Sequence, residues 1–105
     1  MSDFPTRTCL GYGVLTVGST AVDLNDATPA IDNLGSSNCS RAIITIEDDA
    51  IRWRADDTAP TATEGSKFDK DMIFTLMDAD YYHFLRDIKF IRVTTDAKLK
   101  IAYFD

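Results

Sequence analysis

Residues 42–65 read AIITIEDDAIRWRADDTAPTATEG. Two segments rich in apolar and β-branched residues, Ala42–Glu47 and Ile51–Ala55, flank the acidic dipeptide Asp48-Asp49. This pattern predicts two strands that pair as a hairpin around the dipeptide. Alternation along the second strand places Ile51, Trp53 and Ala55 on one side of the sheet and Arg52 and Arg54 on the other.

Trp53 is the only tryptophan of the chain, and we expect it to anchor the core. Burying its side chain would remove about 150–250 Å² from water, worth about 4–6 kcal/mol before conformational entropy is counted. Trp53 could instead form a flat sugar-binding platform with Tyr81 and Tyr82, as in a carbohydrate-binding module. We favour the core, because aromatic residues in strands more often fill cores.

The remaining sequence predicts further short strands separated by turns. These are a hairpin of Tyr12–Val17 and Thr20–Leu24 around Gly18-Ser19, a central strand Met72–Met77, a helical turn within Asp80–Asp87, and a hairpin of Ile88–Thr94 and Lys98–Phe104. About seven strands with little helix predict an all-β fold. We expect residues 1–105 to form one small antiparallel β-sandwich or barrel, jelly-roll-like, with one short helical turn.

Two segments stand apart from this strand pattern. Residues 1–8 carry Phe4 and Pro5 in a polar context and are expected to form an N-terminal arm. Residues 25–40 are dense in Asn, Asp, Ser, Gly and Pro, which predicts a long surface loop with a short helical turn after Thr28-Pro29. Such segments could dock on a neighbouring molecule.

The charge of the chain excludes some partners. Its eleven basic residues are scattered among seventeen acidic ones, giving a net charge of −6. Direct binding to nucleic acid or to an anionic membrane is therefore not expected. No apolar run approaches the roughly 18 residues that span a bilayer, and the first residues do not read as a secretory signal. We expect synthesis and folding in a reducing cytoplasm.

Residues for catalysis are not arranged in any recognisable motif. His83 is the only histidine, and no nucleophile can be argued to lie beside it. Four acidic clusters could offer oxygen ligands to Ca²⁺, but none has the spacing of a calcium loop: Asp48-Asp49, Asp56-Asp57, Asp69 with Asp71, and Asp78 with Asp80. We expect no catalytic residues, no cofactor and no bound metal, although Ca²⁺ binding at an aspartate cluster stays open.

Cys9 and Cys39 are the only cysteines. Their spacing matches neither a redox pair nor a zinc site. In a reducing compartment we expect free thiols, although sequence leaves one disulfide possible.

Two longer stretches resemble one known group of proteins. They are AIITIEDDAIRWRADDTAPTATEGSKF and, after an intervening strand, FLRDIKFIRVTTDAKLKIAYFD. Residues 41–105 are similar to small virion structural proteins of tailed bacteriophages, in which a strand of the IRWR or IRYR type leads into a D-TAPTAT-G loop and the last strand ends in Tyr-Phe. The chain departs from that pattern at Asp57, where Gly is common, and at Ser66-Lys67, where an apolar pair is usual.

The resemblance implies a non-enzymatic virion protein. It fits a capsid decoration (cement) protein, a head–tail or tail adaptor, or a fibre-associated protein. We expect the first, bound to the major capsid protein on the outer capsid surface, because packaged DNA would repel an acidic domain. A trimer is expected in preference to a dimer. The candidate partner contacts are Phe4 and Pro5 of the arm and Arg52 and Arg54 of one strand face.

Overall fold

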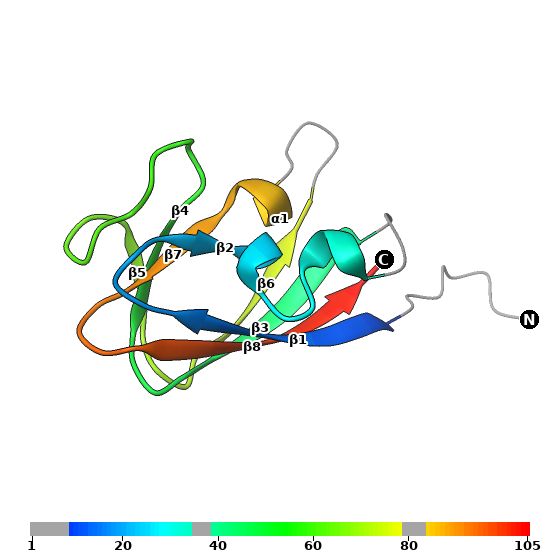
Figure 1. Cartoon of the computed structure of the whole chain (residues 1–105), viewed down its shortest axis with the longest axis horizontal. Helices are drawn as coiled ribbons and strands as arrows, with labels where there is room; N and C mark the ends of the chain where they lie inside the picture. The colour runs from blue at the N-terminus through cyan, green and yellow to red at the C-terminus, as the bar shows by residue number, and fades with distance from the viewer. Residues whose placement is uncertain (1–8, 35–38, 79–83) are drawn as a thin grey trace, which may run out of the picture.

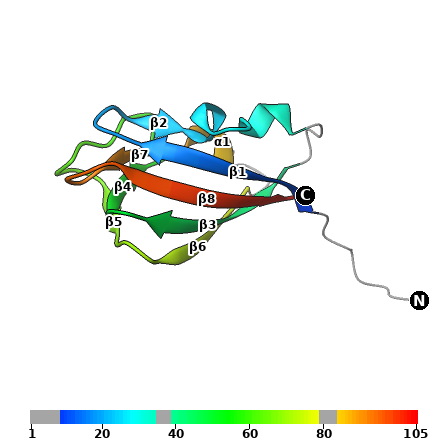
Figure 2. The same ribbon diagram turned by 60° about the horizontal axis from the view of Figure 1, so that its bottom comes forward.

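Two antiparallel four-stranded sheets pack face to face in the computed structural model, which describes residues 9–34, 39–78 and 84–105 (Figures 1 and 2). The first sheet contains, in spatial order, β1 (Cys9–Val17), β8 (Ala97–Phe104), β3 (Arg41–Glu47) and β6 (Ile73–Met77). The second sheet contains β2 (Val22–Asp23), β7 (Lys89–Arg92), β4 (Ile51–Arg54) and β5 (Ser66–Phe68). The short helical elements are η1 (Leu24–Asp26), η2 (Ile31–Asn33) and α1 (Phe84–Asp87).

The strands pair as one long hairpin rolled into a sandwich. β1 pairs with β8, β2 with β7, β3 with β6 and β4 with β5, always antiparallel. Pairing of β3 with β8 and of β4 with β7 then completes each sheet. This is the strand order of a jelly roll. The predicted all-β antiparallel sandwich is confirmed, and the tip of the rolled hairpin is the loop at residues 55–65.

The three predicted hairpins are wrong, because the strands of each one lie in different sheets. The chain crosses between the sheets at residues 18–21, 48–50 and 93–96. A turn signal such as Asp48-Asp49 marks a reversal of the chain, but it does not say whether the next strand pairs locally or crosses over. Among the described strands, β4 and β5 are the one consecutive pair that does pair, and the strand pattern did not predict β5.

Alternating side chains of both sheets fill the core between them. Leu99, Ile101 and Tyr103 of β8 are fully buried, and so is Phe90 of β7 in the other sheet. Trp53 is only half-buried and packs against the margin of this core. The expectation that Trp53 is the main core anchor is therefore wrong. Its strand pairs with the three-residue β5 near the open side of the sandwich, where the cover is incomplete.

β6 is an edge strand, not the central strand that its sequence predicted. Its apolar residues on both faces suggested burial on both faces. In the structure Leu76 points into the core, while the side chains of Ile73 and Met77 are 67% and 58% exposed. One face of the apolar strand β6 therefore contacts solvent.

The short helical elements partly match the sequence analysis. η2 follows Thr28-Pro29, as expected, and α1 lies within the predicted helical turn. Asp78 accepts a hydrogen bond from the backbone nitrogen of Leu85 at 2.8 Å, which fixes α1 against the end of β6. The predictions for Tyr81, Tyr82 and His83, and for the arm at residues 1–8, lie outside the described residues.

The Tyr103 hydroxyl predicts a stabilising substitution. This hydroxyl is buried and has no hydrogen-bond partner among the described residues. Removing an unsatisfied buried polar group without leaving a void is neutral or favourable, so Tyr103→Phe should raise the free energy of unfolding by up to about 1 kcal/mol at pH 7. Tyr12→Phe, at an exposed tyrosine, is the matched control in urea unfolding. A loss of stability in Tyr103→Phe would show that the hydroxyl is satisfied.

The same residue predicts how alkali unfolds the protein. Burial raises the pKa of Tyr103 to about 12, from 10.0. The unfolded chain therefore releases this proton at a lower pH than the folded protein does. The contribution of this group to the free energy of unfolding is complete below pH 10 and is lost as the pH rises towards about 12. Unfolding at pH 9–12 should show a steeper loss in the wild type than in Tyr103→Phe. Equal pH dependence in the two proteins would contradict this assignment.

Asp49 predicts the corresponding effect in acid. Its Oδ2 accepts hydrogen bonds from the backbone nitrogens of Thr94 (2.9 Å) and Thr95 (2.6 Å), joining two of the crossings between the sheets. These bonds lower the pKa of Asp49 below 3.8. The stabilisation is therefore present above pH 3.8 and lost as the pH falls below it. Asp49→Asn should destabilise the protein at pH 7 and flatten its acid unfolding curve, whereas Asp48→Asn should do neither.

Candidate functional site

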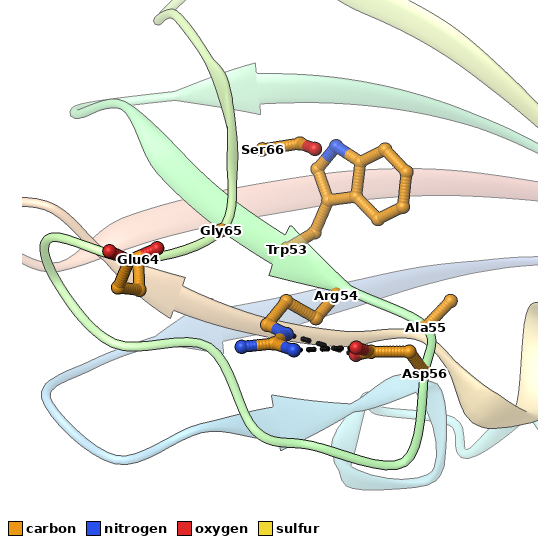
Figure 3. A pocket seen from close by; sticks show the side chains of 7 residues that line it. All are labelled: Trp53, Arg54, Ala55, Asp56, Glu64, Gly65 and Ser66. Carbon is orange, nitrogen blue, oxygen red and sulfur yellow. Dashed lines mark hydrogen bonds and ion pairs between the residues drawn. The ribbon is translucent and has the colours of Figure 1, made fainter.

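A polar pocket of about 430 Å³ opens between β4 and the end of the 55–65 loop (Figure 3). Arg54 and Asp56 form a two-point ion pair in it, with Nε–Oδ1 and Nη2–Oδ2 distances of 2.9 and 2.5 Å. This pair lowers the pKa of Asp56 and raises the pKa of Arg54. The other lining residues are Trp53, Ala55, Glu64, Gly65 and Ser66.

Arg52 holds the loop itself. Its Nε donates to the carbonyl oxygen of Ala62 and its Nη1 to that of Gly65, each at 2.9 Å. Thr61 adds a turn within the loop, because its Oγ1 accepts from the backbone nitrogen of Glu64 at 3.0 Å. Gly65 has a φ of 135°, and a Cβ there would lie 3.1 Å from the carbonyl oxygen of Trp53. The loop is thus built by bonds within the chain.

The charged groups of Arg52, Arg54 and Asp56 in this region already have partners within the chain. Arg52 and Arg54, the two strand residues predicted to contact a partner, use their guanidinium groups on their own loop. Asp56 is neutralised by Arg54, and Glu64 adds a second favourable charge interaction with the same guanidinium. Both carboxylates that line the pocket, those of Asp56 and Glu64, therefore interact with the same Arg54 guanidinium. Across the described parts of the chain, no group of three or more His, Cys, Asp or Glu could hold a metal ion.

The outer face of the first sheet is the second candidate. All the large hydrophobic side chains that are exposed in the described residues lie on this sheet or directly beside it: Tyr12, Ile43, Met72, Ile73 and Met77. One row of paired residues crosses all four strands from Tyr12 through Ala102 and Ile43 to Thr75. Tyr12, Ala102 and Ile43, together with Ile73 and Met77 of β6, therefore form an apolar band across the outer face, with Arg41 and Lys100 at its margins. Exposed apolar clusters are typical of interaction surfaces.

The apolar band continues around the β6 edge into a groove. This groove, of about 290 Å³, lies between β6 and the β4–β5 pair. Phe68 lines it, and the centroid of the Phe68 ring lies 5.9 Å from that of Trp53 and 4.5 Å from that of Phe74. Sequence analysis missed this surface. The available signal was the uncharged run from Met72 to Met77, which was interpreted as a buried strand.

The remaining polar clusters have structural roles. Arg86 contacts Asp78 at 3.3 Å, Asp32 at 3.5 Å and the carbonyl oxygen of Cys39 at 3.4 Å. It thereby joins α1, η2 and the end of β6.

Cys9 is exposed and Cys39 is buried, and both thiols are free. Burial raises the pKa of Cys39, which makes it a poor nucleophile.

Comparison with known proteins identifies no relative: no family model fits the chain, and no curated sequence and no solved structure is similar to it. The similarity to phage virion proteins therefore remains a prediction from sequence. Within the described residues, no helix has the length and apolar character needed to cross a membrane.

The Arg52 bonds predict local loosening of the loop. Arg52→Ala removes both donors to the loop carbonyls, so amide exchange at residues 61–65 should accelerate. Global stability should fall by only about 1 kcal/mol, because the bonds are near the surface. Arg54→Ala, which breaks an exposed ion pair, is the control and should leave exchange at residues 61–65 slow. Equal exchange in the two variants would show that Arg52 does not hold the loop.

Proposed function

We propose that this protein is a non-enzymatic structural protein of a tailed-phage virion, which decorates the outer surface of the capsid. The observation that carries the proposal is the apolar band on the outer face of the first sheet. Exposed apolar patches on soluble domains often mark interaction sites. The jelly-roll strand order is compatible with this role but does not select it, because one fold serves many functions.

Electrostatics supports a position outside the shell. The net charge of −6 would repel packaged DNA. The apolar band can contact the capsid without involving these charges. Contacts of moderate strength suffice in this role, because many copies on one shell act together.

In this proposal the first sheet lies on the major capsid protein. The second sheet, with the ordered loop at residues 55–65, then faces away from the shell. Phe4 and Pro5 stay proposed contacts of the N-terminal arm. Arg52 and Arg54 would contribute through the shape of the loop they hold, because their guanidinium groups are already bonded.

Copy number in purified virions tests the proposal. Decoration predicts several hundred copies for each virion by quantitative mass spectrometry, together with weaker shells when the protein is absent. About six to twelve copies would indicate a ring-shaped tail adaptor instead. Absence from virions would overturn the proposal altogether.

A substitution tests the surface. Tyr12 is 59% exposed, so Tyr12→Lys should change the free energy of unfolding by no more than about 0.5 kcal/mol. It places a charge in the apolar band and should lower the number of copies on the virion severalfold. Thr63→Lys adds the same charge on the exposed 55–65 loop and should leave the copy number unchanged. Equal occupancy in the two variants would exclude this face as the capsid contact.

A further inference from the structure

The four sheet edges formed by the described strands differ in their protection. β1 is covered at its middle, where Val14 and Thr28 exchange backbone hydrogen bonds of 3.1 and 2.9 Å. β2 has two residues and β5 has three, and such short edges pair poorly with other chains. β6 has five residues and no comparable cover among the described residues. It is the edge on which another strand could add.

The hydrogen-bond pattern shows which groups β6 offers. The backbone nitrogen of Ile46 donates to the carbonyl oxygen of Met72 (3.1 Å), and that of Asp78 donates to the carbonyl oxygen of Ser40 (2.8 Å). These two bonds show which residues of this edge bond to β3. Since bonding alternates along an antiparallel strand, the backbone groups of Phe74 and Leu76 point towards β3. Those of Ile73, Thr75 and Met77 point to the open edge. The same three residues carry exposed side chains on the outer face of the sheet.

The composition of β6 gives this edge no safeguard. Its sequence, IFTLM, contains no charged residue, no proline and no glycine. Natural edge strands usually carry a lysine, a proline or a bulge that prevents pairing with another chain. Ile73 and Met77 are among the most exposed large hydrophobic side chains described. An edge of this kind requires a cover.

We propose that β6 pairs antiparallel with β6 of a second copy, with Thr75 on the two-fold axis. In this register Thr75 faces Thr75 of the second copy, and Ile73 faces its Met77. The three residues whose backbone groups point outwards are then the ones that bond across the axis. Threonine pairs and apolar pairs are both favourable across strands.

A second copy fits this edge for reasons of symmetry and charge. The pattern of apolar residue, Thr75 and apolar residue reads the same in both directions, as a two-fold contact requires. Asp78 falls opposite Met72 of the second copy, so the flanking aspartates do not face one another. Each copy carries a net charge of −6, and β6 itself contributes none of it, so the paired strands add no charge repulsion of their own.

The pairing joins two four-stranded sheets into one sheet of eight strands. The two apolar bands then lie side by side on one continuous face. An antiparallel contact between identical edges closes at two copies, so a dimer replaces the trimer expected from sequence. Five residues make a small interface, and we expect a dissociation constant in the micromolar to millimolar range. This inference concerns the isolated protein and stands whether or not it decorates a capsid.

A charge exchange on the two-fold axis tests the register. Sedimentation velocity on the wild type at about 0.01–1 mM should show a concentration-dependent dimer. Thr75→Lys and Thr75→Glu should each be monomeric, because like charges meet on the axis. An equimolar mixture of the two should form a heterodimer that dissociates in high salt. A mixture that stays monomeric while the wild type dimerises would exclude this register.

A proline provides the second test. The Thr75 nitrogen points away from β3, so Thr75→Pro removes a donor from the open edge and leaves the bonds within the sheet. Thr75→Val keeps the donor and is the matched control. Circular dichroism should show both variants folded, with dimers formed by Thr75→Val alone. A wild type that stays monomeric up to about 1 mM, or a Thr75→Pro variant that dimerises like Thr75→Val, would overturn the proposal.

Discussion

The pairing of β8 with both β1 and β3 is the interaction on which the rest of the structure depends. β8 lies inside the first sheet, and its inward side chains Leu99, Ile101 and Tyr103 are fully buried. Its pairing with β1 brings the first and last strands together, and its pairing with β3 connects both to the middle of the chain. Closing such distant segments costs chain entropy, which the burial of a continuous apolar row offsets. The pairs β2–β7, β3–β6 and β4–β5 continue the rolled hairpin from this closed end.

Rolling the chain in this way leaves its two open sides unequal. On one side, β1 is bonded to Thr28, and η1 and η2 contribute Leu24 and Ile31 to the core. On the other side, β5 and β6 end their sheets, and the groove beside Phe68 remains open between them. The exposure of β6 and of the groove beside Phe68 is therefore a consequence of topology. The contacts proposed above lie on that side and on the adjoining outer face.

The sequence contained the strands but not their partners. The sequence pattern located β3 and β8 well, because buried residues alternate with more exposed ones along each strand. The hairpin predictions failed because Gly18-Ser19 and Asp48-Asp49 report only that the chain turns. β6 was misplaced because the sequence of an apolar strand does not show whether its outer face contacts a neighbouring sheet, a second molecule or solvent. Arg52 was expected to meet a partner, and its bonds to the loop at residues 55–65 depend on a contact that no local pattern encodes.

The acidic charge and the apolar edge together suggest how assembly would be controlled. Two domains of charge −6 repel each other at long range, and that repulsion weakens beyond about 10 Å at 0.1 M salt. The short-range contact of β6 then decides the encounter, but five residues give it little strength. Free copies would therefore remain largely separate, which keeps an unprotected edge from aggregating. On a surface that binds many copies through the adjoining sheet face, the local concentration rises and the same weak contact becomes sufficient.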